Sequence, residues 1–385
     1  IDKDGKVTFT PEPEFLGTAT GVTVQRVDKN GTEVTATYQA DVKAATPTGQ
    51  GAETTGLQGQ KQDSHLTFTP GQATINGQNE SVPFSPEGPQ FVVDGQVQQG
   101  NSLPVHDASG KLQGTYTVQP NGDISFQPAP DFYGTPTPAT LRVTDKNGST
   151  AEAVYQPTVT KVTPTSTNDT STGLQGQPQS GKPTFAAGDP AVPLDDTKPL
   201  TFEDGQSTKT VSGVGVYAIN SDGSITFTPD KKYVGTPDPV TVKRADKNGT
   251  PVTATYQATV VPVKPGANND YSSGVVNQAQ TGQVKFTPGS AKIDGTEQSV
   301  DLVPGSLKFV VNDQAVADTT IPALDQDGKQ VGTYSLAQDG TVTFTPNPGY
   351  VGQPVPARVQ ATDVNGTTAE ATSSPVVHAS VTTEG

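Results

Sequence analysis

The sequence repeats itself, and this repeat limits what the chain can fold into. The motif D/N-G-x-[VI]-[TS]-F-[TQ]-P occurs four times, and D-x-N-G follows it each time, 21 residues from the phenylalanine to the asparagine. The phenylalanines are Phe9, Phe126, Phe227 and Phe344, so successive copies are 117, 101 and 117 residues apart. Such a period is longer than a solenoid rung and matches one small domain. The repeat therefore predicts a tandem array of domains.

A third motif locates the length difference between copies. G-L-Q-G-Q begins at Gly56 and Gly173 and returns as G-V-V-N-Q from Gly274, in each case 25 residues after the preceding D-x-N-G glycine. From its first glycine to the next motif phenylalanine are 70, 54 and 70 residues, so the second complete copy is a shortened variant. The predicted domains are a partial copy over residues 1–45 and complete copies over residues 46–163, 164–262 and 263–385.

The residues between copies are rich in Thr, Pro, Gly, Asn and Ser, which is typical of linkers. We expect these seams to be short, partly extended linkers. They are Thr46 to Thr55, Thr163 to Thr172 and Pro262 to Ser273.

Local patterns favour an all-β fold. The apolar residues are mostly valine, with no methionine, which favours strands over helices. Val22 and Val24 alternate with polar residues before a D-K-N-G turn, and Val34 begins a second alternating run after it. Two-residue alternation on both sides of a tight turn predicts a hairpin, with Asp28 accepting backbone hydrogen bonds and the turn glycine in the left-handed conformation. No segment shows helical apolar spacing over ten or more residues. We therefore predict an elongated tandem array of small antiparallel β-sandwich domains.

The motifs resemble the CshA-type fibril repeat of Gram-positive bacterial cell-surface adhesins, once partially and three times fully. The resemblance rests on Asp222 to Pro229, Tyr233 to Pro237, Arg244 to Thr250 and Thr172 to Pro178. It implies a stalk that holds an adhesive tip away from the cell, anchored to wall peptidoglycan through an anchor outside this stretch. The implied location is extracellular, on the bacterial surface. The implied partners, through the parent protein, are a host matrix protein or other bacterial cells, with roles in co-aggregation, biofilm formation and virulence.

An alternative function is that the repeats themselves bind a matrix protein such as fibronectin, or a partner fibril.

Two positions depart from the repeat pattern. Val275-Val276-Asn277 replaces the leucine-glutamine-glycine motif, and Ser373 stands where Tyr38, Tyr155 and Tyr256 stand in the other copies. We expect lower local stability at both. The three tyrosines are predicted to be core aromatics in preference to ligand platforms.

Composition excludes several function classes. The chain has no cysteine, which excludes thiol chemistry, disulfides, cysteine-ligated zinc and iron–sulfur clusters. Its net charge is −15 and no Lys/Arg cluster occurs, which argues against nucleic acid and anionic membranes as partners. No apolar run reaches the roughly 18 residues of a membrane span, so we expect no membrane insertion.

We predict no enzyme, no cofactor, and no catalytic, cofactor-binding or metal-binding residue. The histidines His65, His106 and His378 do not recur in phase with the repeat, and nucleophile, phosphate-loop and dinucleotide motifs are absent. A glycan hydrolase using paired carboxylates is a distant third alternative, because no acid pair stands out from the turn residues.

Three further alternatives concern acidic and asparagine-rich turns. Calcium binding at residues 2–5, 268–270 or 325–328 is weighed against plain turn formation, which is favoured because no EF-hand pattern occurs. Lys–Asn isopeptide crosslinks are disfavoured, because the recurring asparagines lie in turns where we expect them to be solvated. These asparagines each head an N-G-[ST] triplet, formally a glycosylation acceptor and a candidate deamidation point, although turn formation explains the triplet. They are Asn30, Asn147, Asn248 and Asn365.

Overall fold

The chain folds into β-strands joined by turns, as the valine-rich alternation predicts. The computed structural model describes residues 1–380, none of which lies in a helix. Contacts divide the chain into two compact units, each described by itself. Unit 1 is Ile1–Pro164, Ala187–Asp195 and Ala245–Thr250; unit 2 is Thr165–Ala186, Asp196–Arg244 and the chain from Pro251 onward.

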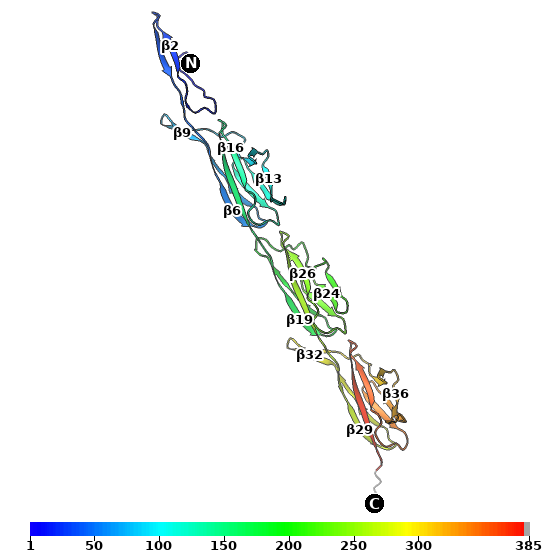
Figure 1. Ribbon diagram of the computed structural model, residues 1–385. Helices are drawn as coiled ribbons and strands as arrows, with labels where there is room; N and C mark the ends of the chain where they lie inside the picture. The colour runs from blue at the N-terminus through cyan, green and yellow to red at the C-terminus, as the bar shows by residue number, and fades with distance from the viewer. Residues whose placement is uncertain (381–385) are drawn as a thin grey trace. The chain divides into compact units, whose positions relative to one another are not determined.

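Unit 1 contains one complete sandwich. Its two sheets have the strand orders β12-β11-β16-β17-β6 and β13-β14-β15-β7, and β9 with β10 forms a separate hairpin (Figure 1). The strands up to β17 are β1 (Gly17–Thr18), β2 (Val22–Val27), β3 (Glu33–Tyr38), β4 (Asp41–Val42), β5 (Thr48–Gln50), β6 (Ala52–Leu57), β7 (Gln62–His65), β8 (Thr67–Thr69), β9 (Gln72–Ile75), β10 (Gln78–Ser81), β11 (Gln90–Val93), β12 (Gln96–Val97), β13 (Ser102–His106), β14 (Leu112–Val118), β15 (Asp123–Pro128), β16 (Ala139–Thr144) and β17 (Thr150–Thr160).

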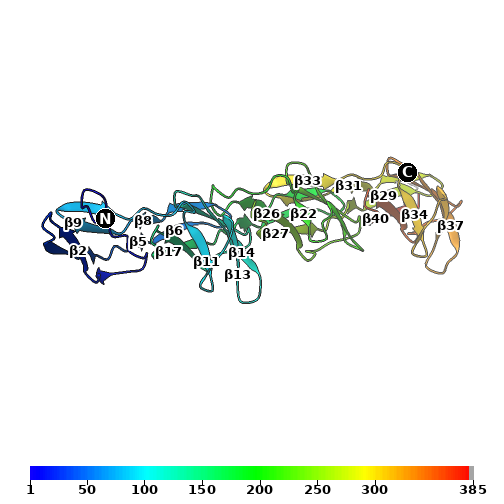
Figure 2. The same cartoon turned by 90° about the horizontal axis from the view of Figure 1, so that it is seen from above.

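Unit 2 contains two sandwiches of the same plan. One pairs the sheets β19-β27-β26-β22 and β20-β25-β24-β23, and the other pairs β29-β40-β39-β34-β35 and β30-β38-β37-β36 (Figure 2). The strands are β18 (Thr165–Thr167), β19 (Asp169–Leu174), β20 (Gln179–Gly181), β21 (Thr184–Ala186), β22 (Thr201–Phe202), β23 (Thr208–Val211), β24 (Gly215–Ile219), β25 (Ile225–Pro229), β26 (Val240–Ala245), β27 (Pro251–Val261), β28 (Gly266–Asn268), β29 (Asp270–Val275), β30 (Gln280–Gln283), β31 (Lys285–Thr287), β32 (Gly289–Ile293), β33 (Thr296–Val300), β34 (Lys308–Val311), β35 (Gln314–Ala315), β36 (Thr320–Leu324), β37 (Gln330–Leu336), β38 (Thr341–Pro346), β39 (Ala357–Thr362) and β40 (Thr368–His378).

The phenylalanine motif forms the central core strand of each sandwich. Phe126 in β15 lies opposite Tyr116 in β14, with the two ring centroids 4.7 Å apart, and both side chains are fully buried. The same pair recurs as Tyr217 with Phe227 and as Tyr334 with Phe344. Each of the three strands ends at the motif proline, because proline has no N–H to donate to the ladder.

The predicted core tyrosines are confirmed in two copies. Tyr155 and Tyr256 have no exposed surface, whereas Tyr38 is 37% exposed, because its strand β3 pairs with β2 in a sheet of two strands. Ser373, the departure in the last copy, is also buried. The predicted hairpin is confirmed, since β2 and β3 pair antiparallel on both sides of the turn at Asp28.

The prediction that the seams are linkers is corrected here, because β-strands occupy much of each seam. The first seam contains β5 and part of β6, and β6 pairs in parallel with β17. The same parallel pairing joins β19 to β27 and β29 to β40. The sandwiches are thus antiparallel except for one parallel pair each. The seams are extended because each pairs along two strands. The first of these, β5, β18 or β28, pairs with β8, β21 or β31, and the second, β6, β19 or β29, pairs with the last strand of the same sandwich.

The shortened copy lacks a hairpin. Phe68 and Phe91 are 23 residues apart, and the stretch between them holds the β9–β10 hairpin. The corresponding phenylalanines Phe185 and Phe202 are only 17 residues apart, and no strand lies between β21 and β22. The β32–β33 hairpin occupies this place in the last copy.

Candidate functional site

The G-L-Q-G-Q motifs form tight turns at the end of the parallel strands β6 and β19. The Gln60 amide donates to the Leu57 carbonyl at 3.0 Å, and Gly59 has a φ of +81°. The second motif repeats this geometry, with Gly176 at a φ of +76°. Only glycine adopts such a φ without steric cost. We call residues 56–60 and 173–177 the glycine turns.

A buried glutamine ties each glycine turn to its own sandwich. Gln58 is 3% exposed; its Oε1 accepts from the Val162 amide at 3.1 Å, and its Nε2 donates to the Pro130 carbonyl at 2.9 Å. Gln175 makes the matching bonds to the Val263 amide and the Lys231 carbonyl, at 3.3 and 3.0 Å. Each glutamine therefore joins three separate segments.

The D-x-N-G motifs form loops that an aspartate closes, as predicted. Asp246 is fully buried, and its Oδ1 accepts from the backbone amides of Asn248 and Thr250, both at 2.9 Å. Gly249 has a φ of +81°. The same two bonds form at Asp28, Asp145 and Asp363, at 2.8 to 2.9 Å. We call residues 28–31, 145–148, 246–249 and 363–366 the asparagine loops.

Each glycine turn holds one asparagine loop. In unit 1, Asn248 Nδ2 donates to the Gln58 carbonyl at 2.8 Å; in unit 2, Asn365 Nδ2 donates to the Gln175 carbonyl at 2.7 Å. Both pairs are separated by 190 residues in the sequence. A Cβ on Gly59 would overlap the Asn248 side chain, and a Cβ on Gly176 would overlap that of Asn365. The turn–loop contact thus needs glycine for its backbone conformation and for space.

The expectation that the recurring asparagines are solvated is wrong for two of the four. Asn365 is 4% exposed and Asn248 is half-buried, because a glycine turn covers each of them. Asn30 and Asn147 are exposed, and within residues 1–380 their side-chain amides have no hydrogen-bond partner. The common spacing of 190 residues was the sequence signal that could have indicated the contact.

The two turn–loop contacts have different surroundings. In unit 2, Ile293 and Val300 of the β32–β33 hairpin pack with Leu174 and Val263 in a small buried cluster. The Gln177 Nε2 also donates to the Ser299 carbonyl at 3.0 Å. In unit 1, residues 187–195 form no such hairpin, and Leu57, the counterpart of Leu174, is only half-buried.

The third copy of the turn departs from the pattern. Asn277 takes the place of the glycine and keeps a left-handed φ of +64°, which asparagine tolerates better than most residues. Its Oδ1 accepts from the Gly349 amide at 2.8 Å. Val276, in place of the buried glutamine, leaves only its backbone amide to bond, to the His378 carbonyl at 2.8 Å. The asparagine side chain occupies the side on which Gly59 and Gly176 leave room.

Titratable groups do not gather into a site. Among residues 1–380, no three His, Asp or Glu side chains lie close enough together to hold a metal ion. The exposed His65 Nδ1 lies 2.8 Å from Asp123 Oδ1, and hydrogen bonds from Asn121 and then His65 lower the Asp123 pKa. Burial raises the pKa of the core Tyr217 to about 12.

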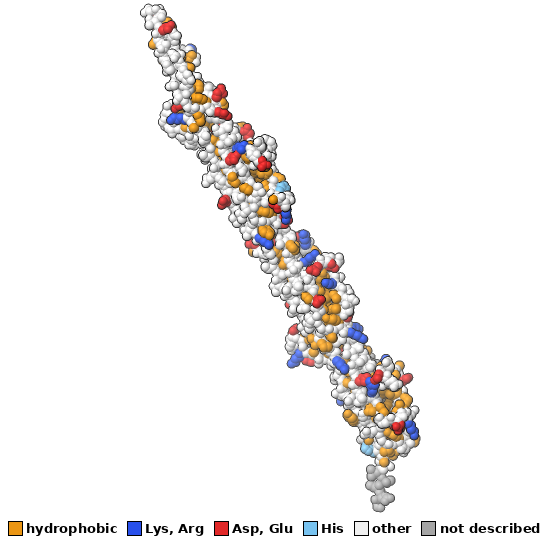
Figure 3. Space-filling view, viewed as in Figure 1, with side chains coloured by type: hydrophobic (Ala, Val, Ile, Leu, Met, Phe, Trp, Pro, Cys, Tyr) orange, Lys and Arg blue, Asp and Glu red, His pale blue; other side chains and the backbone are white. Residues whose placement is uncertain are grey.

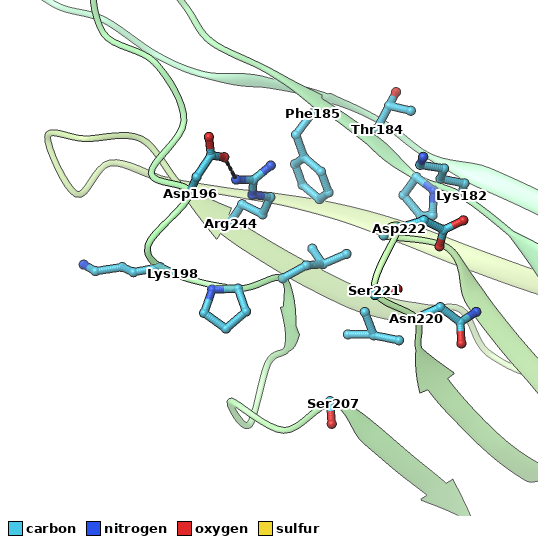
Figure 4. A pocket seen from close by; sticks show the side chains of 15 residues that line it. Lys182, Thr184, Phe185, Asp196, Lys198, Ser207, Asn220, Ser221, Asp222 and Arg244 are labelled. Atoms are coloured by element: carbon cyan, nitrogen blue, oxygen red, sulfur yellow. Dashed lines mark hydrogen bonds and ion pairs between the residues drawn. The ribbon is translucent and has the colours of Figure 1, made fainter.

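A cavity of about 560 Å³ lies in unit 2, in the shortened copy. Figure 4 shows the Arg244–Asp196 ion pair at one side, 2.9 Å long, and Lys182 with Asp222 at the other. Phe185 forms part of the apolar lining. The buried Arg244 Nε has no hydrogen-bond partner within the described part of the chain. Arg26 stands at the same repeat position in the partial copy, whereas Val143 and Ala361 stand there in the other two complete copies.

The surface carries charges of both signs. On the face shown in Figure 3, acidic and basic side chains are scattered over each unit without a large patch of one sign. No helix long and apolar enough to cross a membrane occurs in residues 1–380.

The fold and the recurring turns and loops define a class of protein: tandem all-β repeats built on the sandwich plan. The sequence model of the surface adhesin CshA repetitive domain matches residues 1–42, 44–159, 161–260 and 262–377. The chain belongs to this family, which confirms the resemblance found in its motifs. It is a repeat region of a surface adhesin, and this membership places it outside the cell, at its surface.

Comparison with curated proteins finds no match. Among solved structures, the I67–I69 fragment of titin is similar with a TM-score of 0.31 and 9% identity, covering 88% of this chain and 97% of that one. The protocadherin GammaB4 extracellular domain has a TM-score of 0.34 and 12% identity, covering 94% and 60%. Drosophila N-cadherin EC1-3 has a TM-score of 0.27 and 10% identity, covering 86% and 98%.

Proposed function

We propose that this chain is a non-enzymatic stalk segment of a bacterial adhesin anchored to the cell wall, as in Gram-positive species. The repeats would project an adhesive tip toward host matrix or other cells, with co-aggregation and biofilm formation as the outcome. The proposed mechanical units are residues 1–45, 46–163, 164–262 and 263–385. Four tandem family matches support this proposal.

The turn–loop contact is the observation that carries the proposal. With these boundaries, Gln58 and Asn248 belong to consecutive copies, and so do Gln175 and Asn365. Each of these hydrogen bonds joins a glycine turn, which a buried glutamine holds in place, to an asparagine loop, which an aspartate closes. Such a bond limits bending of one copy against the next. A stalk needs such a restraint, because a freely jointed array would not hold a tip at a fixed distance.

Small-angle scattering of the full chain tests the stalk. We expect a stiff, extended particle whose maximum dimension shrinks when Gly59→Ala and Gly176→Ala are combined. The matched control is Gly148→Ala, at an exposed loop glycine with an open surrounding and a φ of +85°. A coil-like profile for the unaltered chain would contradict the proposal.

Direct binding by the repeats is a second candidate function, favoured by the Arg244 cavity. The Arg244 Nε has no partner among residues 1–380, while Nη2 pairs with Asp196; a guanidinium with a spare donor beside an apolar wall is suited to a carboxylate carried on a peptide or glycan. Surface plasmon resonance of the full chain on fibronectin tests it, with Arg244→Ala as the variant and Arg142→Ala as the control. Binding to fibronectin that is weaker in Arg244→Ala and unchanged in Arg142→Ala would support this function. If the unaltered chain does not bind, direct binding is rejected and the stalk is the only proposed function.

A further inference from the structure

The four asparagine loops place one reactive dipeptide in two different surroundings. Each loop contains Asn-Gly followed by Ser or Thr. We propose that these loops are sites of spontaneous deamidation, and that a glycine turn protects the asparagine of the loop that it holds, as at Asn248 and Asn365. The inference rests on the turn–loop contact alone, so it holds for the chain whether or not it serves as a stalk.

The reaction needs only water and a base. The backbone nitrogen of the following glycine loses its proton to hydroxide and attacks the asparagine Cγ. A new N–Cγ bond forms, the Cγ–Nδ2 bond breaks, and ammonia leaves with a proton from water. The resulting succinimide ring is opened by water at either carbonyl, which gives aspartate or isoaspartate. Glycine favours this attack because it has no side chain to shield its nitrogen.

The loops are closely matched in their backbone, so the comparison isolates the contact. Each loop glycine has a φ of +81° to +85°. Its amide donates to the loop aspartate carbonyl at 2.9 to 3.0 Å in every copy. Residues 145–148 and 246–249 even share the sequence D-K-N-G. Within residues 1–380, a glycine turn covers Asn248 and none covers Asn147.

The contact holds the reacting group in place. Asn248 Nδ2, the nitrogen that must leave, donates to the Gln58 carbonyl at 2.8 Å, and Asn365 Nδ2 donates to the Gln175 carbonyl at 2.7 Å. To meet the glycine nitrogen, the asparagine side chain must first give up this bond. At Asn365, which is 4% exposed, water and hydroxide are also kept away. Protection is therefore expected to be stronger in unit 2 than in unit 1.

Deamidation would prevent the contact from forming again. The product replaces the Nδ2 donor with a carboxylate oxygen, which can only accept hydrogen bonds at neutral pH. That oxygen would face the Gln58 or Gln175 carbonyl, another acceptor. A turn–loop contact that stays open long enough to react is thus permanently lost, and isoaspartate marks the opened copy.

Incubation of the unaltered full chain at mildly alkaline pH, followed by peptide mass spectrometry, tests the inference. We expect isoaspartate to accumulate fastest at Asn30 and Asn147, about tenfold more slowly at Asn248, and slowest at Asn365, since one net hydrogen bond corresponds to roughly this factor. In a chain of residues 1–385, where no glycine turn within residues 1–380 covers Asn147, equal rates at Asn147 and Asn248 would overturn the proposal, and this comparison needs no variant to fold.

Two variants then assign the protection to each turn. Gly59→Ala is expected to raise the Asn248 rate to that of Asn147 while leaving Asn365 unchanged, and Gly176→Ala is expected to do the converse. An unchanged Asn248 rate in Gly59→Ala, with the sandwich cores still protected from hydrogen exchange, would contradict the role of the turn. The product is mimicked by Asn248→Asp, for which we expect faster exchange at residues 246–250 than in the unaltered chain.

Discussion

The two turn–loop contacts use the same residues and differ in what lies beside them. In unit 2, the β32–β33 hairpin covers the contact with Ile293 and Val300. In unit 1, the copy that supplies Asn248 is the shortened one, and no hairpin covers Leu57. The difference shows that the length of a neighbouring segment decides whether a hydrogen bond common to both sites is shielded from solvent or partly exposed to it.

The comparison gives the shortened copy a structural consequence. Six of its missing residues fall between the phenylalanines that flank the hairpin in the other copies, as the spacings of 17 and 23 residues show. Asn365 is buried and Asn248 is half-buried as a result. Alternating long and short copies would therefore alternate tight and loose contacts along an array.

Removing the space for the loop should have the largest effect. Gly176→Ala forces an L-residue into a left-handed conformation and overlaps Asn365, so we expect local stability to fall by about 2 to 4 kcal/mol. Gly59→Ala should cost less, because the half-buried Asn248 has more freedom to move away. Hydrogen exchange of residues 246–250 and 363–367 measures both. Equal losses at the two sites would contradict the difference in their surroundings.

The hairpin should account for much of the remaining difference. Val300→Ala deletes two methyl groups from a fully buried position, with an expected loss of about 2 kcal/mol in unit 2. Its matched control is Val82→Ala, at the corresponding, half-buried position of unit 1. Hydrogen exchange in the Asn365 loop should rise in the first variant. If exchange there stays unchanged, the hairpin does not seal the contact.

Much of the fold could be predicted from the sequence, because its signals are local. The alternating valines and the D-x-N-G turn act within a few residues, and they form the predicted strands and hairpin turn. The seams could not be predicted: their Thr, Gly and Ser residues show no apolar alternation, and their partner is a strand about 100 residues later, as for Thr54 and Tyr155.

The turn–loop contact was missed for a related reason. Gly59 and Asn248 each suit a turn, so the turn explained each residue fully without a partner. Glycine is also needed to leave space for the side chain of a residue 190 positions away, and neither local pattern indicates this need. Only the coincidence of two recurring motifs carried that information.

Replacing the buried glutamine of a glycine turn should lower stability by the same amount in both units. Gln58→Ala leaves the Val162 amide and the Pro130 carbonyl without their partner in a buried setting, which we expect to cost about 1 to 2 kcal/mol. Gln175→Ala should cost a similar amount, because its side chain makes the same two bonds, to the Val263 amide and the Lys231 carbonyl. Val276→Ala is the control at the third turn. Exchange of the Val162 and Val263 amides measures the loss, and a large difference between the two variants would contradict this reasoning.

Substituting Asn277 in the third turn should have the smallest effect on stability. It tests most directly whether glycine serves for backbone conformation or for space. Asn277→Gly relieves a left-handed asparagine but removes the bond to the Gly349 amide, so stability should change by no more than about 0.5 kcal/mol. The same exchange in reverse, Gly59→Asn, should keep the backbone conformation yet fill the space that Asn248 uses. We expect it to open the unit 1 contact while the turn itself persists, seen as faster exchange in residues 246–250 with the Gln60 amide still protected. Loss of protection at both places would mean that conformation, and not space, is what glycine supplies.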